Sequence, residues 1–362
     1  MYLKSWSMLW SKGRGENKNV DTEQKLERLC AIAAPSGFER PAALAAREML
    51  EPLMDEVWMD RLGNLVGVRR CGKPGAKRLL LDAHLDEVGL TVIGIENGFL
   101  RFQGIGVDAR MLPDREVTVL TEPPLLGMVA CLPPHVLSSE ERENAPKMEE
   151  LFIDVGLSQE EAEQKVPLGT PVAYKANFLR LGERQLCGKS MDDRACFVSL
   201  LRAVELLKDR KLNVDLYVLG STCEEVGGMG ARVVTQALSP DYCVAVDVTH
   251  GRTPDGPKEE TFVLGGGPVV GVGPNATRWM VQRMLDAAQR EGIAVQREVM
   301  EGSSGTNGWG MQICNEGVAT AVLSIPLKYM HTPVETLDKN DIEDTARLLA
   351  AFAGSFGEEG AQ

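Results

Sequence analysis

Seven side chains of this chain could bind metal ions or transfer protons, and each lies where a predicted strand ends. They are His84, Asp86, Asp192, Glu224, Glu225, Asp247 and His331. Imidazole nitrogens and carboxylate oxygens in this mixture suit one or two borderline-hard ions such as zinc, cobalt or manganese. One His-x-Asp pair alone would say little. The seven side chains fall at five places along the chain, and together these places indicate a metallohydrolase.

His84 and Asp86 are two residues apart at the end of the apolar run 79–81. In an extended chain they face the same way, so the imidazole can bind a metal while the carboxylate stands behind it as its hydrogen-bond partner. The alternative is a histidine at a strand end that bonds only to nearby backbone. The other candidate sites make that alternative the weaker one.

In each of two acidic pairs, the two neighbouring side chains are expected to have different roles. Asp192 and Asp193 precede a predicted helix, so one is expected to cap it while the other bridges two ions, and we favour Asp192 as the bridge. Glu224 and Glu225 follow an apolar strand and should point in opposite directions. One of these glutamates could therefore bind metal while the other acts as a base.

The last candidates complete the set. Asp247 closes the apolar strand 244–246, and a carboxylate in that place needs a partner such as a metal or a helix N-terminus. His331 is the second histidine in a ligand-like context. We expect His135, in a proline-flanked loop, at the surface. His250 is expected near the site, ranked below the two main histidines.

Composition excludes several classes of protein. The net charge is −13 with no basic stripe, so nucleic acid is not expected as a partner. No run approaches 18 apolar residues, so no membrane span is predicted. The 8 cysteines have no Cys-x-x-Cys spacing, which argues against a zinc finger. Buried free thiols suit a reducing compartment, and we expect a cytoplasmic protein.

The pattern along the chain predicts an α/β fold with an insertion. Helical and strand-like segments alternate over 21–92 and 183–362, which favours a mostly parallel sheet with helices on both faces. Such sheets bind ligands at the carboxyl ends of their strands, where every candidate residue falls. Residues 93–182 are predicted as a small β-rich domain, with a hairpin turn at Asn97-Gly98. Residues 1–20 are expected to be a flexible tail, with a leader as the alternative.

Taken together, these segments resemble the M42 family of metallo-aminopeptidases, which includes glutamyl and tetrahedral aminopeptidases. The resemblance covers about 25–355 and rests on five motifs: Ala83-His84-Leu85-Asp86-Glu87-Val88-Gly89, Asp192-Asp193-Arg194, Glu224-Glu225-Val226-Gly227, Asp247-Val248-Thr249 and Tyr329-Met330-His331-Thr332-Pro333-Val334-Glu335.

The resemblance implies roles for the individual residues. It implies a site for two divalent ions, zinc or cobalt, held by His84, Asp192, Glu225, Asp247 and His331, with Asp192 bridging. It further implies Glu224 as general base and Asp86 as the residue that orients His84.

The resemblance also implies the assembly and the substrates. The insert 93–182 would mediate dimerisation in a homo-oligomer, and family members often build hollow dodecamers. The long interval between His84 and Asp192 accommodates this insert, whereas related carboxypeptidase-type enzymes carry their extra domain after the Glu-Glu pair. The expected activity is removal of N-terminal residues from short peptides.

Three positions depart from the family pattern. Asn307 stands in Gly305-Thr306-Asn307 where the family usually has Gly-Thr-Asp, and Lys328 precedes Tyr329 where an arginine is usual. Asp82 replaces a small or apolar residue. Because the proposed ligands are intact, activity is expected, and the departures bear on substrate preference. We expect Asn307 in a loop that borders the site.

Two other functions fit the sequence less well. A glycosidase needs two carboxylates that face each other across a sugar and needs no histidines, which adjacent Glu224 and Glu225 fit poorly. An inactive self-assembling scaffold would predict lost ligands, and none is lost.

Overall fold

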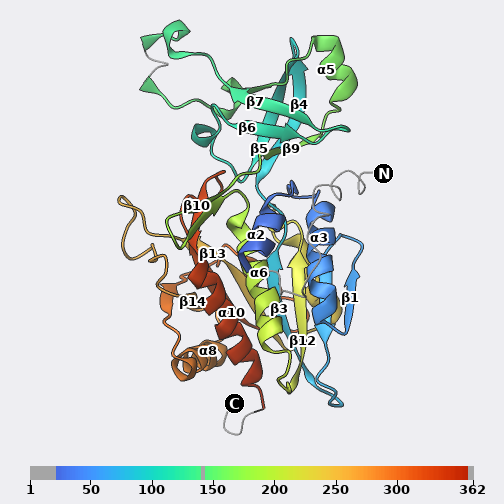
Figure 1. Ribbon diagram of the computed structural model, residues 1–362, viewed down its shortest axis with the longest axis vertical. Helices are drawn as coiled ribbons and strands as arrows, with labels where there is room; N and C mark the ends of the chain where they lie inside the picture. Colours follow the sequence, from blue (N-terminus) through green and yellow to red (C-terminus); the bar gives the residue numbers. More distant parts are fainter. Residues whose placement is uncertain (1–21, 140–142, 358–362) are drawn as a thin grey trace.

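The computed structural model describes residues 22–139 and 143–357, which form a mixed sheet flanked by helices and a barrel at one end of the molecule (Figure 1). The predicted tail, 1–20, lies outside the described residues. The eight strands of the sheet are, in spatial order, β1 (Glu56–Met59), β2 (Leu65–Arg69), β12 (Val214–Ser221), β3 (Lys77–His84), β13 (Tyr242–His250), β16 (Ala319–Leu327), β14 (Val269–Val272) and β15 (Gln296–Val299).

The centre of the sheet is parallel, and antiparallel pairs join the flanking strands to it. Strands β12, β3, β13 and β16 pair in parallel, as do β14 and β15 at one edge. Strand β2 pairs antiparallel with both β1 and β12, and β14 pairs antiparallel with β16. Four of the seven neighbouring pairs are parallel, so the sheet has the predicted parallel centre but is mixed as a whole. The short turn at 60–64 between β1 and β2 explains one flank, because a parallel pair would need a long crossover.

Helices cover both faces of this sheet (Figure 1). They are α2 (Thr22–Cys30), α3 (Arg40–Leu50), α6 (Met191–Leu206), α7 (Met229–Leu238), α8 (Arg278–Glu291), α9 (Asn307–Met311) and α10 (Lys339–Gly354). In β3, Leu79 and Leu81 belong to the core that contains α6 and α10, while Leu80 belongs to the core beneath α7 and α9. Burial on both faces explains why this strand is continuously apolar.

The β-rich region forms a closed barrel with its own core (Figure 1). Its strands are, in spatial order, β4 (Gly89–Glu96), β5 (Phe99–Ile105), β8 (Phe152–Asp154), β7 (Leu125–Ala130), β6 (Glu116–Val119) and β9 (Pro171–Tyr174), and α5 (Gln159–Lys165) lies against it. Asn97 and Gly98 form the predicted hairpin turn, with φ of 52° and 87°. Both values suit the left-handed turn that links twisted strands.

A small sheet connects the barrel to the larger sheet. It consists of β10 (Phe178–Leu181), β11 (Gln185–Gly188) and β17 (Glu335–Asp338). Strand β10 falls inside the predicted insert, 93–182, yet it pairs with β11 and not with the barrel. Short 3-10 turns lie at η1 (Glu51–Leu53), η2 (Ala109–Met111), η3 (Pro134–Val136) and η4 (Met148–Glu150).

None of the helices in the described chain is long and apolar enough to cross a membrane. All eight cysteines are free thiols, and Cys30, Cys187, Cys196, Cys243 and Cys314 are buried.

A buried ion cluster fixes the turn from β11 into α6. The Arg194 guanidinium is fully buried and donates to the carbonyls of Leu29 and Ile32, each at 2.6 Å. It also pairs with Glu87 at 3.3 Å, and Lys189 pairs with the other oxygen of that carboxylate at 2.7 Å. These contacts tie α2, the segment after β3 and the start of α6 together, and so hold the aspartates before Arg194 beside the end of β3.

We predict that Arg194→Lys destabilises the fold by about 3–5 kcal/mol, because a lysine cannot reproduce the planar set of donors and leaves Glu87 with a poorer partner. Chemical denaturation measures the loss. Arg202→Lys, on the same helix with a partly exposed pair to Glu343, is the matched control and should change stability by less than about 1 kcal/mol. Equal losses in both variants would contradict this account of the Arg194 cluster.

Candidate metal centre

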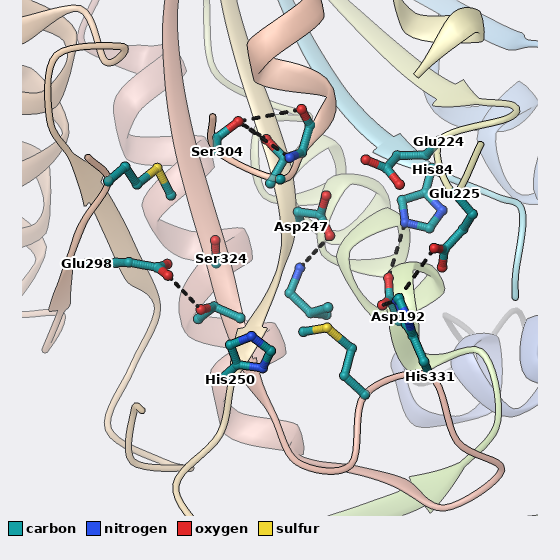
Figure 2. A pocket seen from close by; sticks show the side chains of 16 residues that line it. His84, Asp192, Glu224, Glu225, Asp247, His250, Glu298, Ser304, Ser324 and His331 are labelled. Atoms are coloured by element: carbon teal, nitrogen blue, oxygen red, sulfur yellow. Dashed lines mark hydrogen bonds and ion pairs between the residues drawn. The ribbon is translucent and has the colours of Figure 1, made fainter. Parts of the chain in front are cut away.

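All of the predicted site residues except Asp86 line one cavity of about 200 Å³ (Figure 2). His84 ends β3, Asp192 lies at the start of α6, Glu224 and Glu225 follow β12, Asp247 lies in β13, and His331 follows β16. Because the four central strands are parallel, their carboxyl ends meet at one edge and bring these segments together.

Asp192 lies between the two histidines (Figure 2). Its Oδ1 is 3.1 Å from Nε2 of His84, and its Oδ2 is 3.3 Å from Nε2 of His331. Burial alone would raise the pKa of Asp192, but the two imidazoles outweigh burial and lower it. One carboxylate that presents a separate oxygen to each imidazole has the arrangement that a bridging ligand needs.

Two sets of donors could each hold an ion. One contains His84, Asp192 and Glu225, and the other contains His84, Asp193 and Asp247, with one donor atom of each residue within 4.8 Å of the others. Glu225 Oε2 also lies 3.4 Å from His331 Nε2. Thus every predicted ligand has another predicted ligand beside it.

One of the two aspartates was expected to cap the helix, but among the described hydrogen bonds neither Asp192 nor Asp193 caps α6. Instead, Oδ2 of Asp193 accepts a hydrogen bond from the His84 backbone amide at 3.0 Å. Its Oδ1 is buried with no partner in the described residues. Asp193 therefore faces the centre, because the chain at both aspartates departs from helical geometry.

Asp86 is fully buried behind His84 and holds several groups. His84 Nδ1 is 3.1 Å from the Asp86 carbonyl oxygen and 3.4 Å from its carboxylate Oδ1, so the carbonyl is the nearer partner. The carboxylate accepts from Ser36 Oγ at 2.7 Å and from the backbone amides of Glu224 and Glu225 at 3.1 and 3.2 Å. Asp86 thus positions the glutamate pair as well as the imidazole, whose Nε2 faces Asp192.

Glu335 is a supporting residue to which the sequence analysis gave no role. It is buried and accepts from the backbone amide of His331 at 2.8 Å and from that of Asp192 at 3.2 Å. His331 has a φ of 64°, a left-handed conformation that costs a non-glycine residue about 1 kcal/mol or more. The bond to Glu335 holds it there. The only sequence signal was a glutamate shortly after His331-Thr332-Pro333.

The centre carries more negative charge than its histidines can balance. Burial raises the pKa of Glu224 to about 7 and that of Glu225 to about 9, and the Asp192 carboxylate adds to both shifts. Burial also raises the pKa of Asp247 well above its usual range. Glu225 Oε1 is buried with no partner among the described residues. This donor set fits divalent cations, which would stabilise the ionised carboxylates.

The other two histidines lie as expected. His135 is exposed in η3, and His250 lines the same cavity as the predicted ligands. Glu298 also lines the cavity, although the sequence analysis did not single it out.

Asn307 does not lie in a loop on the cavity wall. It is the first residue of the short helix α9 and is buried, while its neighbour Thr306 lines the cavity. Asn307 Nδ2 donates to Asp82 Oδ2 at 2.8 Å and to Ser221 Oγ at 2.9 Å. Two of the three departures from the family pattern, Asn307 and Asp82, are therefore partners in one buried contact.

Comparisons with known proteins agree with this geometry. The family model described as M42 glutamyl aminopeptidase matches residues 63–348. The chain is 36% identical to the lysyl aminopeptidase of Pyrococcus furiosus over 90% of this chain and 95% of that protein. The chain belongs to the M42 aminopeptidase family and is a peptidase.

Solved structures show the same fold. An aminopeptidase from the archaeon Desulfurococcus kamchatkensis matches with a TM-score of 0.85 and 33% identity, over 92% of this chain and 94% of that one. The TET1 peptidase of Pyrococcus horikoshii, which can assemble into a tetrahedron or a large octahedral shell, matches with a TM-score of 0.81 and 31% identity. That match covers 92% of this chain and 99% of the other.

We predict that Asn307→Asp destabilises the protein by about 2–4 kcal/mol at pH 8, because it buries a second carboxylate against Asp82. Burial already raises the pKa of Asp82 to about 6, and the new carboxylate would raise it further. The folded variant would then bind a proton that the unfolded chain releases. Its stability should rise as the pH falls, and its deficit relative to the parent should shrink towards pH 5.

Denaturation at both pH values measures this effect. Combining Asp82→Asn with Asn307→Asp restores one carboxylate facing one amide and should recover most of the loss. Asn97→Asp, at an exposed hairpin tip, is the control and should cost less than about 0.5 kcal/mol. A single Asn307→Asp variant as stable as its parent at pH 8 would contradict the buried pairing.

Proposed function

We propose that this protein is a two-metal aminopeptidase that removes N-terminal residues from short peptides. The observation that carries the proposal is the position of Asp192, with one oxygen towards His84 and the other towards His331. In this proposal His84 and Asp247 complete one site, Glu225 and His331 complete the other, and Asp192 is shared. Bound zinc or cobalt would supply Lewis-acid polarisation of a carbonyl and a more acidic water.

Glu224 is the proposed general base. It lines the cavity but belongs to neither of the two donor sets. In Figure 2 the side chains of Glu224 and Glu225 lie on either side of the His84 ring, as expected for neighbours that face different ways. Burial raises the pKa of Glu224 to about 7, close to the value at which a carboxylate can take a proton from water and return it to the leaving amine.

The remaining residues prepare the site for this chemistry. The His84 contacts through Nδ1 favour the tautomer in which Nε2 is free to bind a cation. Asp86 and Glu335 hold the backbone of four proposed functional residues by accepting their amide hydrogens. The cavity of about 200 Å³ that these residues line is where the end of a peptide would bind.

Neither alternative gains support from the described residues. Glu224 and Glu225 are adjacent in the chain and do not form a pair that faces across a sugar ring. An inactive scaffold has no need for the predicted ligands around one cavity.

We further propose that the protein forms homo-oligomers through its barrel. Support comes from the shells of the similar Pyrococcus horikoshii peptidase and from exposed apolar side chains on barrel strands β4 and β7. These are Ile93, Leu126 and Met128, which are 56%, 56% and 42% exposed. The mass of a single chain in light scattering at micromolar concentration would contradict this assembly.

Hydrolysis of aminoacyl p-nitroanilides tests the function directly. We expect turnover with added zinc or cobalt, and loss of at least about a hundredfold in excess EDTA, because chelation removes the polarising ions. Restoring the metal should restore the rate. Unchanged turnover in excess EDTA would contradict the metal-dependent mechanism.

Substitutions of the two adjacent glutamates should affect activity and metal content in different ways. Glu224→Gln keeps the shape but cannot accept a proton, so kcat should fall by about 10²–10⁴-fold while metal content stays near that of the parent. Glu225→Ala removes an anionic ligand, so it should lose metal first and recover partly at high metal concentration. Rates and elemental analysis on both variants test this. The opposite pattern would show that the roles are reversed, and equal metal loss would mean that neither is a dedicated base.

A further inference from the structure

The cavity has two chemically different sides (Figure 2). His84, Asp192 and Glu225 gather on one side. Glu298, from the edge strand β15, lies across the cavity from them, with Asp247 and Ser324 between in this view. A substrate whose scissile bond lies at the metal centre therefore has this second wall within the same enclosure.

Glu298 places a carboxylate in this wall, and no lysine or arginine of the described residues pairs with it. Its Oε1 accepts a hydrogen bond from Thr249 Oγ1 at 3.1 Å, and no described residue donates to its Oε2. Burial raises the pKa of this carboxyl. No lysine or arginine of the described chain lines the cavity, and His250 is the one lining side chain outside the proposed ligands that could become positive.

A purely structural role explains Glu298 poorly. Gln296, two residues earlier on the same strand, is the one that fastens β15. Its Oε1 accepts from the Val263 amide at 2.9 Å, and its Nε2 donates to the carbonyls of Val263 and Gly267 at 3.0 and 3.1 Å. Glu298 makes a single side-chain hydrogen bond, and that one would be equally possible for a glutamine. The negative charge at this position therefore has no use in holding the strand.

We propose that Glu298 selects peptides whose N-terminal residue is lysine or arginine, an inference that rests on the proposed aminopeptidase function. A long basic side chain would bring its ammonium or guanidinium group to the carboxylate, forming a charge-assisted hydrogen bond. Met300 and Met330, which also line the cavity, offer flexible apolar contacts to the aliphatic stem. An acidic side chain would be repelled, and leucine would leave Oε2 of the carboxylate without a partner.

The experiment compares kcat/KM for lysyl, leucyl and glutamyl p-nitroanilides in the parent and in Glu298→Gln. We expect the parent to favour lysine over leucine by at least about tenfold. Glu298→Gln should lower the rate on lysine by about 10–100-fold and change that on leucine by less than about threefold, because only a positive side chain uses the charge. Glu298→Lys should instead raise the rate on the glutamyl substrate.

The possible failures are distinguishable. Equal losses on all substrates in Glu298→Gln would mean that the residue binds the α-ammonium group or supports the fold, and would overturn the proposal. Hydrolysis by the parent without a preference for lysine would overturn it while leaving the aminopeptidase function intact. No hydrolysis of any aminoacyl substrate with metal present would overturn both. Glu301→Gln, an exposed neighbour outside the cavity lining, is the matched control and should leave the lysine-to-leucine ratio unchanged.

Discussion

Buried negative charge around one small cavity is the constraint on which the rest of this structure depends. Asp192, Glu224, Glu225 and Asp247 line this cavity with three imidazoles, and Asp193 and Glu335 are buried beside them. Carboxylates removed from water and placed side by side cannot all remain ionised unless cations balance them. Burial, together with the neighbouring carboxylates, accordingly raises the pKa values of Glu225 and Asp247. Two divalent ions would supply the missing charge at the positions where it is concentrated.

The scaffold meets this constraint with contacts that come from distant parts of the chain. Asp86 and Glu335 each accept hydrogen bonds from two backbone amides, and each thereby holds two proposed functional residues in place. Arg194 and Lys189 neutralise Glu87 one layer further in. Glu87 is therefore paired with cations, whereas backbone amides alone donate to Glu335. A site preorganised in this way needs little rearrangement when it binds a cation.

Much of this could be predicted from the sequence because the site is built at strand ends. Apolar runs located the central strands, and the polar residue that closes each run identified His84 and Asp247. The antiparallel flanks were not predictable from that alternation, because strand direction depends on which edge a strand joins. The end of the insert was also misplaced, since β10 has the same short, turn-bounded pattern as the barrel strands.

The supporting residues were harder to predict because their roles are set by tertiary contacts. Glu335 acts on Asp192, which is far away in the sequence, and its only local signal is its place at the end of the motif that contains His331. Asn307 was expected in a loop that borders the site, yet it begins a helix that packs over the sheet and reaches Asp82. Glu298 lies on a strand with no distinctive sequence pattern. Its place in the cavity wall, which suggests a role for its charge, is seen only in the folded structure.

The central claim is that Asp192 is shared between two metal sites, and metal content per chain tests it most directly. Elemental analysis after reconstitution with zinc or cobalt and removal of free metal should give close to two ions per chain. Removing His331 by substitution with alanine should lower this towards one, since His84 and Asp247 would still hold the other ion. One ion or fewer in the parent protein, or no change in the His331→Ala variant, would contradict the account.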